Sequence, residues 1–135
     1  MTPVEVAALV AAALMAAVIG FQVALAAGLP LGEATMGGRA STTHGVLQPP
    51  FRVIALSSAL VLVLAAWIVL ARAGMLPVFL AGQALAVGAW VVAGFLALNT
   101  LSNLSGRHPL ERWGMASITL VAGLLIGYVA YAAPP

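Results

Sequence analysis

Apolar residues fall into four runs of about 20 residues, the length that a helix needs to cross the hydrocarbon core of a bilayer. Segments rich in Gly, Pro and Arg separate the runs, which cover about 4–27, 53–71, 78–98 and 113–131. Gly28 and Gly74 follow the first two runs, and Pro77 is placed as a first-turn proline of the third. The pattern predicts an all-α, polytopic membrane protein: a four-transmembrane-helix bundle forming one integral membrane domain over residues 1–135.

Composition supports this assignment. The chain is 64% hydrophobic and only 6% charged, whereas a soluble domain devotes about a quarter of its residues to charge. A soluble globular protein is therefore excluded, and the lipid bilayer is the first expected partner. The first run has no Arg or Lys before it and exceeds the apolar region of ~7–15 residues found in signal peptides. We therefore expect it to remain in the protein as a membrane span.

Missing residue types exclude several chemistries. Without Cys there is no thiolate nucleophile or disulfide, and without Lys there is no Schiff base or Walker-type phosphate loop. Without Asp, phosphotransfer built on aspartate clusters is also excluded. The net charge of +2 is too small to indicate a nucleic-acid partner. We predict no catalytic residue, metal or cofactor, and an enzyme acting on a lipid or isoprenoid is only a distant third hypothesis.

Arginine positions predict the orientation in the membrane. Four spans place both termini on one side and loops 28–52 and 102–112 on the other. Arg72 belongs to the side of the termini, and the loop side holds the other four arginines: Arg39, Arg52, Arg107 and Arg112. The positive-inside rule then makes both loops cytoplasmic and both termini external, in the inner membrane of a bacterial cell.

Polar residues within the runs gather toward the same end as the loops. They are Gln22, Ser57, Ser58, Asn99, Thr100, Asn103, Ser117 and Thr119. An unpaired amide in hydrocarbon costs several kcal/mol, so these groups are expected to face one another inside the bundle. Asn99 and Asn103 are four residues apart and share a helix face, which suits contacts between helices or a pocket wall. The pattern predicts a polar pocket or a hydrogen-bonded plug near the cytoplasmic face.

The first loop is far longer than the usual connection between bundle helices. Two interpretations stay open: a Gly-rich lid that bends over the helix ends, or a solvated linker. His44 and His108 raise the question of a metal site, but neither has a second ligand at helical spacing, and we predict none. The candidate ligand-binding residues from the spans and both loops are Gln22, Glu33, Arg39, His44, Asn99, Asn103, His108 and Glu111.

Small residues mark surfaces on which helices can approach one another closely. In the first run they recur every fourth residue from Ala8 to Gly28, and in the fourth run Gly123 and Gly127 repeat the spacing. The candidate helix-packing residues are Ala12, Ala16, Gly20, Gly123 and Gly127. Such a pattern serves packing within one chain or association between chains, and the sequence does not choose between the two.

Several short motifs carry a resemblance. They are Gly28-Leu29-Pro30-Leu31-Gly32 with Gly37-Gly38-Arg39, then Gly45-Val46-Leu47 with Pro49 or Pro50 and Arg52, and later Asn99-Thr100-Leu101-Ser102-Asn103 with Ser105 and Glu111-Arg112. In about half its length the chain resembles a family of small, four-span, actinobacterial-type integral membrane proteins that are uncharacterised. The resemblance transfers no activity. It implies that the two loops form one shared feature.

Two functional hypotheses of different classes follow. The first is a membrane protein that binds a small apolar or lipid-like ligand at the polar cytoplasmic end of the bundle. Gln22, Asn99 and Asn103 would line that site. The loop residues that would cover it are Glu33, Arg39 and His44. The second is a non-catalytic accessory or assembly subunit of a larger membrane complex, or a homo-oligomer. Because no carboxylate lies at the middle of a run, the proton-coupled drug exporters of similar size are a poor match.

Overall fold

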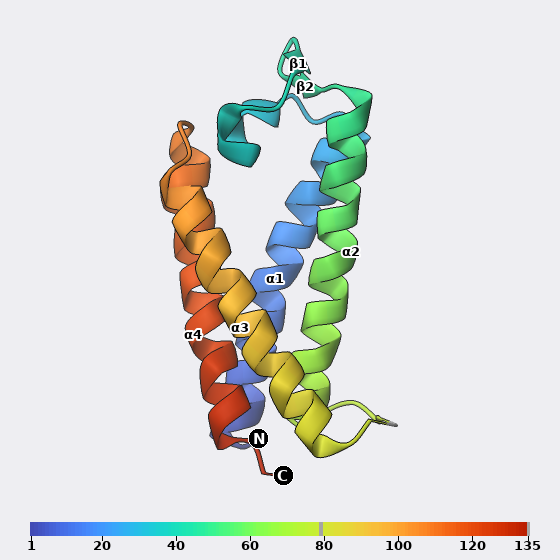
Figure 1. Ribbon diagram of the computed structural model, residues 1–135, viewed down its shortest axis with the longest axis vertical. Coiled ribbons are helices and arrows are strands. Elements are labelled where there is room, and N and C mark those ends of the chain that lie inside the picture. The colour runs from blue at the N-terminus through green and yellow to red at the C-terminus, as the bar shows by residue number, and fades with distance from the viewer. Residues whose placement is uncertain (79, 135) are drawn as a thin grey trace.

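The computed structural model describes residues 1–78 and 80–134 and is dominated by four long helices (Figure 1). They are α1 (Pro3–Ala27), α2 (Pro49–Arg72), α3 (Gly82–Leu104) and α4 (Ala116–Ala132), and α4 is preceded by a π-helical turn, η3 (Leu110–Met115). All four helical segments, with η3 and α4 counted together, are long and apolar enough to cross a membrane. The chain is thus an all-α four-helix bundle and a multi-pass membrane protein, as the sequence predicts.

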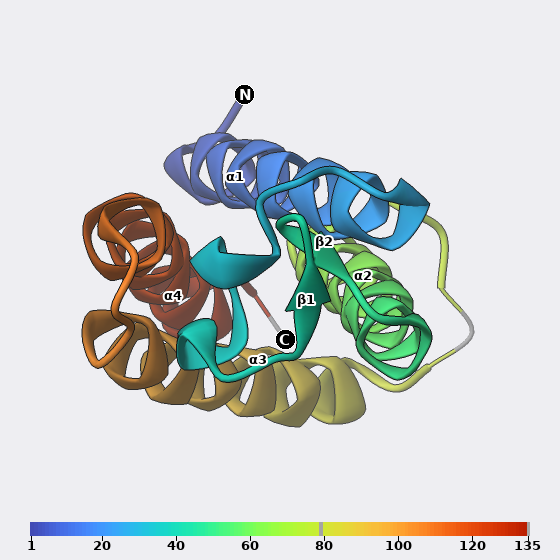
Figure 2. The same cartoon turned by 90° about the horizontal axis from the view of Figure 1, so that it is seen from above.

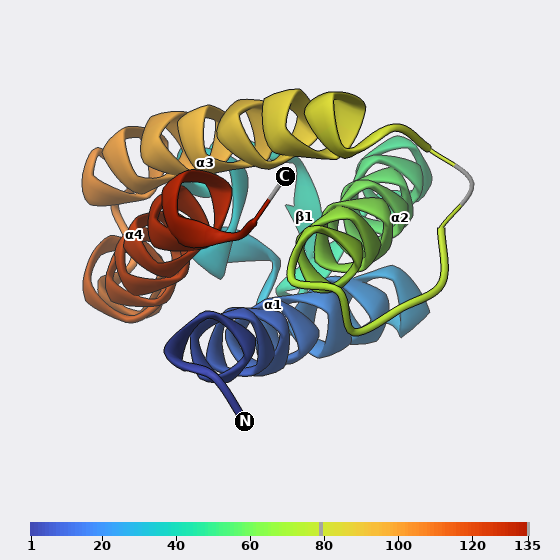
Figure 3. The same cartoon turned by 90° about the horizontal axis from the view of Figure 1, so that it is seen from below.

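Several helix boundaries differ from the predicted ones: α2 and the fourth helical segment begin earlier, and α3 begins later and ends later, at Leu104. Helix α2 begins at Pro49, because proline is well tolerated in a first helical turn. Helix α3 begins at Gly82, after an extended Ala81, so the first-turn role predicted for Pro77 is wrong. The left-handed Gly74 (φ 75°) turns the chain after α2. The loop between α2 and α3 is visible at the end of the bundle that holds the termini (Figure 3).

Charged side chains stabilise the helix ends. At the start of α1, the Glu5 N–H donates to Thr2 Oγ1 (3.2 Å) and the Thr2 N–H donates to Glu5 Oε2 (2.8 Å), forming a capping box. Helix α1 has no basic residue in its last turn, but Arg52 supplies one from α2, because its Nε donates to the carbonyl of Ala26 (2.6 Å). Arg72 donates to the carbonyls of Ala133 and Pro134 and so anchors the C-terminal segment to α2.

The interior of the bundle is built largely from alanine. Ala8, Ala11 and Ala89 are fully buried, together with larger side chains such as Ile126. Viewed from either end, the four helices form a ring in the order α1, α2, α3, α4 (Figures 2 and 3). Between α3 and α4, the hydroxyls of Thr100 and Thr119 lie 2.9 Å apart and share a hydrogen bond. Many leucine and valine side chains are exposed, as expected for a surface that lipid covers.

The candidate packing residues divide between the inside and the outside of the bundle. Gly123 lies against α3, where an added Cβ would come 3.4 Å from the Leu96 Cβ, and Gly127 lies near the Trp90 ring. Ala12 is half-buried, whereas Ala16 and Gly20 are exposed, and nothing else in the described structure would come within 4 Å of a Cβ at Gly20. The interior face of α1 instead uses Ala7, Ala8, Ala11 and Met15.

The first loop folds over one end of the bundle, and we call residues 29–48 the cap (Figure 2). It contains two 3₁₀ turns, η1 (Gly32–Ala34) and η2 (Met36–Gly38), and a hairpin of β1 (Thr42–Thr43) and β2 (Val46–Leu47). Leu47 is buried against Leu25 of α1 and Ala55 of α2. The cap therefore packs on the helix ends, which favours the lid over the solvated linker.

Cysteine labelling will test this topology, because the natural chain has no Cys. Thr43→Cys, Ser105→Cys and Pro77→Cys each place a thiol at an exposed position. In intact cells we expect an impermeant maleimide to label the Pro77 variant and to spare the other two. Labelling of the Thr43 and Ser105 variants but not of the Pro77 variant would show that the orientation is opposite to the predicted one. Labelling of all three from one side would contradict a four-span topology.

Candidate functional site

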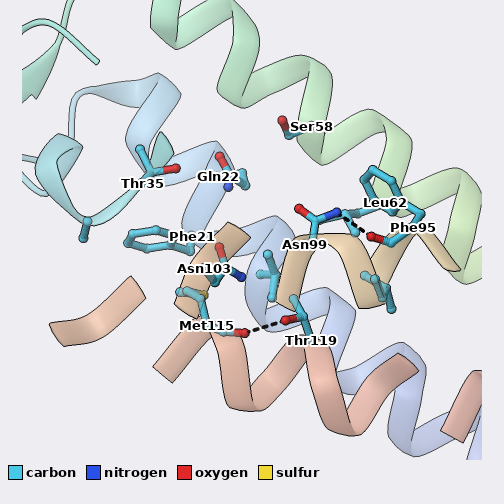
Figure 4. A pocket seen from close by; sticks show the side chains of 13 residues that line it. Phe21, Gln22, Thr35, Ser58, Leu62, Phe95, Asn99, Asn103, Met115 and Thr119 are labelled. Atoms are coloured by element: carbon cyan, nitrogen blue, oxygen red, sulfur yellow. Dashed lines mark hydrogen bonds between the residues drawn. The ribbon is translucent and has the colours of Figure 1, made fainter. Parts of the chain in front are cut away.

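A polar cavity of about 90 Å³ lies beneath the cap, between the helices (Figure 4). Every helix contributes to its wall, and the cap contributes two residues. The lining residues are Val18, Phe21, Gln22, Ala34, Thr35, Ser58, Leu62, Phe95, Leu96, Asn99, Asn103, Met115 and Thr119. We refer to this space as the polar cavity. It brings together Gln22, Asn99 and Asn103, the three span residues for which the sequence predicts a shared pocket.

Hydrogen bonding around the polar cavity is incomplete. Asn99 Nδ2 donates to the carbonyl of Phe95 (2.9 Å), and Ser58 Oγ donates to the carbonyl of Ile54 (2.9 Å). These bonds return to the residue's own helix, which leaves the side-chain oxygens free to accept. Gln22 Oε1 is buried, and no donor for it is present among residues 1–78 and 80–134. A buried acceptor without a partner is rare and calls for an explanation, and next to a cavity a bound water or ligand is one that can supply the missing hydrogen.

The cap closes the polar cavity with Ala34 and Thr35, which are 1% and 7% exposed. Immediately after them, Met36 (φ 53°), Gly37 (φ 69°) and Gly38 (φ 69°) are all left-handed. Two glycines make this conformation accessible, whereas Met36 adopts it at a steric cost. The turn directs the Gly37 N–H toward the second loop.

Glu111 holds the cap in place from the opposite side of the bundle end. It is only 3% exposed, and its Oε1 accepts the Gly37 N–H at 2.8 Å. Glu111 Oε2 is buried without a donor in the described part of the chain, and Gly106 lies so close that a Cβ there would collide with it. Glu111 does not line the polar cavity. It is a positioning residue that joins the two loops, although the sequence suggests a ligand-binding role.

The remaining candidate residues lie outside the polar cavity. Glu33, Arg39 and His44 are exposed, so the structure does not place them as its cover. His44 occupies the hairpin turn (φ 51°), and His108 Nδ1 accepts the Leu110 N–H (3.1 Å) at the start of η3. Charged side chains stay in water at this end, whereas the short side chains of Ala34 and Thr35 enter the bundle. A second, more open pocket of about 310 Å³ is lined in part by Glu33, Arg107 and His108.

The polar cavity is suited to binding rather than to acid–base chemistry. Amides and hydroxyls form its polar part, and none of the described lining residues is ionisable. No group of three or more His, Cys, Asp or Glu side chains that could hold a metal ion occurs within the described ranges. No protein-family model, curated protein or solved structure matches this chain. The function is therefore inferred from the geometry of the site.

Replacing Glu111 tests whether it holds the cap. In Glu111→Ala the Gly37 N–H loses its acceptor, and a hydrogen bond to a carboxylate contributes about 1.5–3 kcal/mol. We expect amide hydrogen exchange in segment 32–38 to accelerate by about tenfold or more, since 1.4 kcal/mol corresponds to a factor of ten. Glu111→Gln keeps an oxygen acceptor and should change the rate much less. If the exchange rate of segment 32–38 is unchanged in both variants, Glu111 does not hold the cap.

Proposed function

We propose that this chain is a multi-pass membrane protein that binds a small lipid-like ligand in the polar cavity beneath the cap. The buried, unpaired Gln22 Oε1 carries the proposal. Other polar side chains in the spans, such as Ser57 and Ser117, donate to carbonyls four residues earlier in their own helices. Gln22 makes no such bond within its own helix, and its side chain is one of those that line the polar cavity.

The size of the polar cavity limits what can enter. A cavity needs roughly 10–15 Å³ of such space to hold one water, so about 90 Å³ accommodates several waters or a polar group of a few atoms. Leu62, Phe95 and Leu96 form an apolar wall next to the amides. This combination suits a ligand with a small polar group attached to an apolar part.

The cap gives the site a means of opening and closing. It covers the cavity with two small residues and is secured to the second loop through the bond between Gly37 and Glu111. We place the cap at the cytoplasmic face of a bacterial inner membrane, because four of the five arginines belong to the two loops at this end. A ligand would then be received from, or released to, that face.

A non-catalytic accessory role is the second candidate, and a different observation favours it. Ala16 and Gly20 are exposed on α1 and are not used in packing within the chain. Small residues on a lipid-facing helix allow the backbone of another helix to approach closely. A second copy of this chain or another membrane protein would be the partner.

Asn99→Leu and Gln22→Leu test the proposed function. Each removes amide groups from the polar cavity and should reduce binding by about tenfold or more, because an unmatched polar group costs about 1–3 kcal/mol. The protein would be purified in mild detergent, and the small molecules bound per protein would be quantified by mass spectrometry. Ser117→Ala is the matched control, because Ser117 is exposed and does not line the cavity.

Two outcomes would oppose the proposal. If both leucine variants retain the same molecules as the natural protein, the polar cavity is not the binding site. Co-purification of a membrane protein in stoichiometric amount, with no small molecule bound, would favour the accessory role instead.

A further inference from the structure

An apolar groove of about 230 Å³ runs between α2 and α3 on the surface that faces lipid. The α2 wall is formed by Val61, Leu64, Ala65 and Ile68, and the α3 wall by Val91, Val92 and Phe95. We call the space between these two walls the apolar groove. Between Val61 and Ile68 it follows α2 for about 10 Å, at 1.5 Å per residue.

The apolar groove and the polar cavity share a wall. Phe95 lines both of them, and Leu62 of the cavity is adjacent in sequence to Val61 of the groove. The Phe95 ring and the Leu62 side chain lie together beside Asn99 at the edge of the polar cavity (Figure 4). Beyond Phe95, the lining residues Ile68 of α2 and Val91 of α3 lie farther toward the end of the bundle that holds the termini. A molecule that occupied both would place a polar end near the cap and an apolar end deeper in the bilayer.

We infer that the ligand is a single-chain lipid with an uncharged, hydroxyl-bearing head, its head in the polar cavity and its chain in the apolar groove. This inference rests on the proposed function and specifies its ligand class. The head is expected to be uncharged because the described cavity wall contains amides and hydroxyls but no ionic side chain. A carboxylate or phosphate head would lack a cation, and an ammonium head would lack a carboxylate. A hydroxyl can both donate to Gln22 Oε1 and accept from an amide.

The groove wall favours a hydrocarbon chain over a helix as the occupant. Val61, Leu64, Ile68 and Val91 are large or β-branched, whereas a surface for helix association is enriched in Gly, Ala, Ser and Thr. A hydrocarbon chain that leaves water for this groove strengthens the binding of a small polar head that is taken from the aqueous phase.

Three probes separate the contributions of head and chain: the monoacylglycerol monoolein, oleic acid and glycerol. Native mass spectrometry of the purified protein would measure the binding of each. We expect monoolein to bind, oleic acid to bind about tenfold more weakly or worse, and glycerol to bind too weakly for detection, since each factor of ten is 1.4 kcal/mol. Oleic acid binding as tightly as monoolein would overturn the uncharged head. Glycerol binding as tightly as monoolein would overturn the role of the chain.

Val61→Trp fills the apolar groove from its lipid-facing side and should weaken monoolein binding by about tenfold or more. Leu60→Trp is the control, because the neighbouring Leu60 is 64% exposed, compared with 49% for Val61, and does not line the groove. Circular dichroism would verify that both variants keep the helical fold.

The comparison with Asn99→Leu distinguishes the two proposals. If monoolein binding is lost in Asn99→Leu but unchanged in Val61→Trp, the polar cavity keeps its proposed function and the groove inference fails. If neither substitution alters monoolein binding, both fail. Weakening by both, with the Leu60 control unaffected, is the result that the structure predicts.

Discussion

Inside a bilayer, every hydrogen-bonding group must find a partner within the protein, because hydrocarbon supplies none. Ser58 and Thr100 satisfy this constraint by donating to carbonyls one turn earlier in their own helices. Arg52 Nε and the two terminal nitrogens of Arg72 satisfy it by donating to main-chain carbonyls of other segments at opposite ends of the bundle, whereas Arg72 Nε is buried without an acceptor in the described residues. Gln22 Oε1 is the exception next to the polar cavity, and the proposed function follows from that exception.

The same constraint explains why the cap is built as it is. A cap over apolar helix ends has to bury its own backbone without leaving donors unpaired. The Gly37 N–H reaches Glu111 across 74 residues of sequence, and the Gly32 N–H donates to the Gly45 carbonyl within the cap (2.8 Å). Met36 accepts a strained backbone so that this arrangement can form. The hydrogen bond between Gly37 and Glu111 thus joins the two loops beside the polar cavity, in addition to the apolar packing of Leu47 on the helix ends.

Much of this architecture could be predicted from the sequence, because hydrocarbon thickness fixes span length and apolar runs reveal it. The meeting of Gln22, Asn99 and Asn103 was also predictable, since amides in apolar runs must face inward. The role of Glu111 was not, because its partner is a backbone group whose direction depends on three successive left-handed residues. Sequence spacing also gave no indication that Ala34 and Thr35, rather than Glu33, would enter the bundle, nor that Ala16 and Gly20 would face outward.

The most direct test of the account is a crystal structure of the protein purified from its own membranes, examined at the polar cavity. The account predicts density for a bound molecule within hydrogen-bond distance of Gln22 Oε1, continuing past Phe95 into the apolar groove. A cavity filled only by ordered water that satisfies Gln22, or closed by repacking of its side chains, would contradict the account.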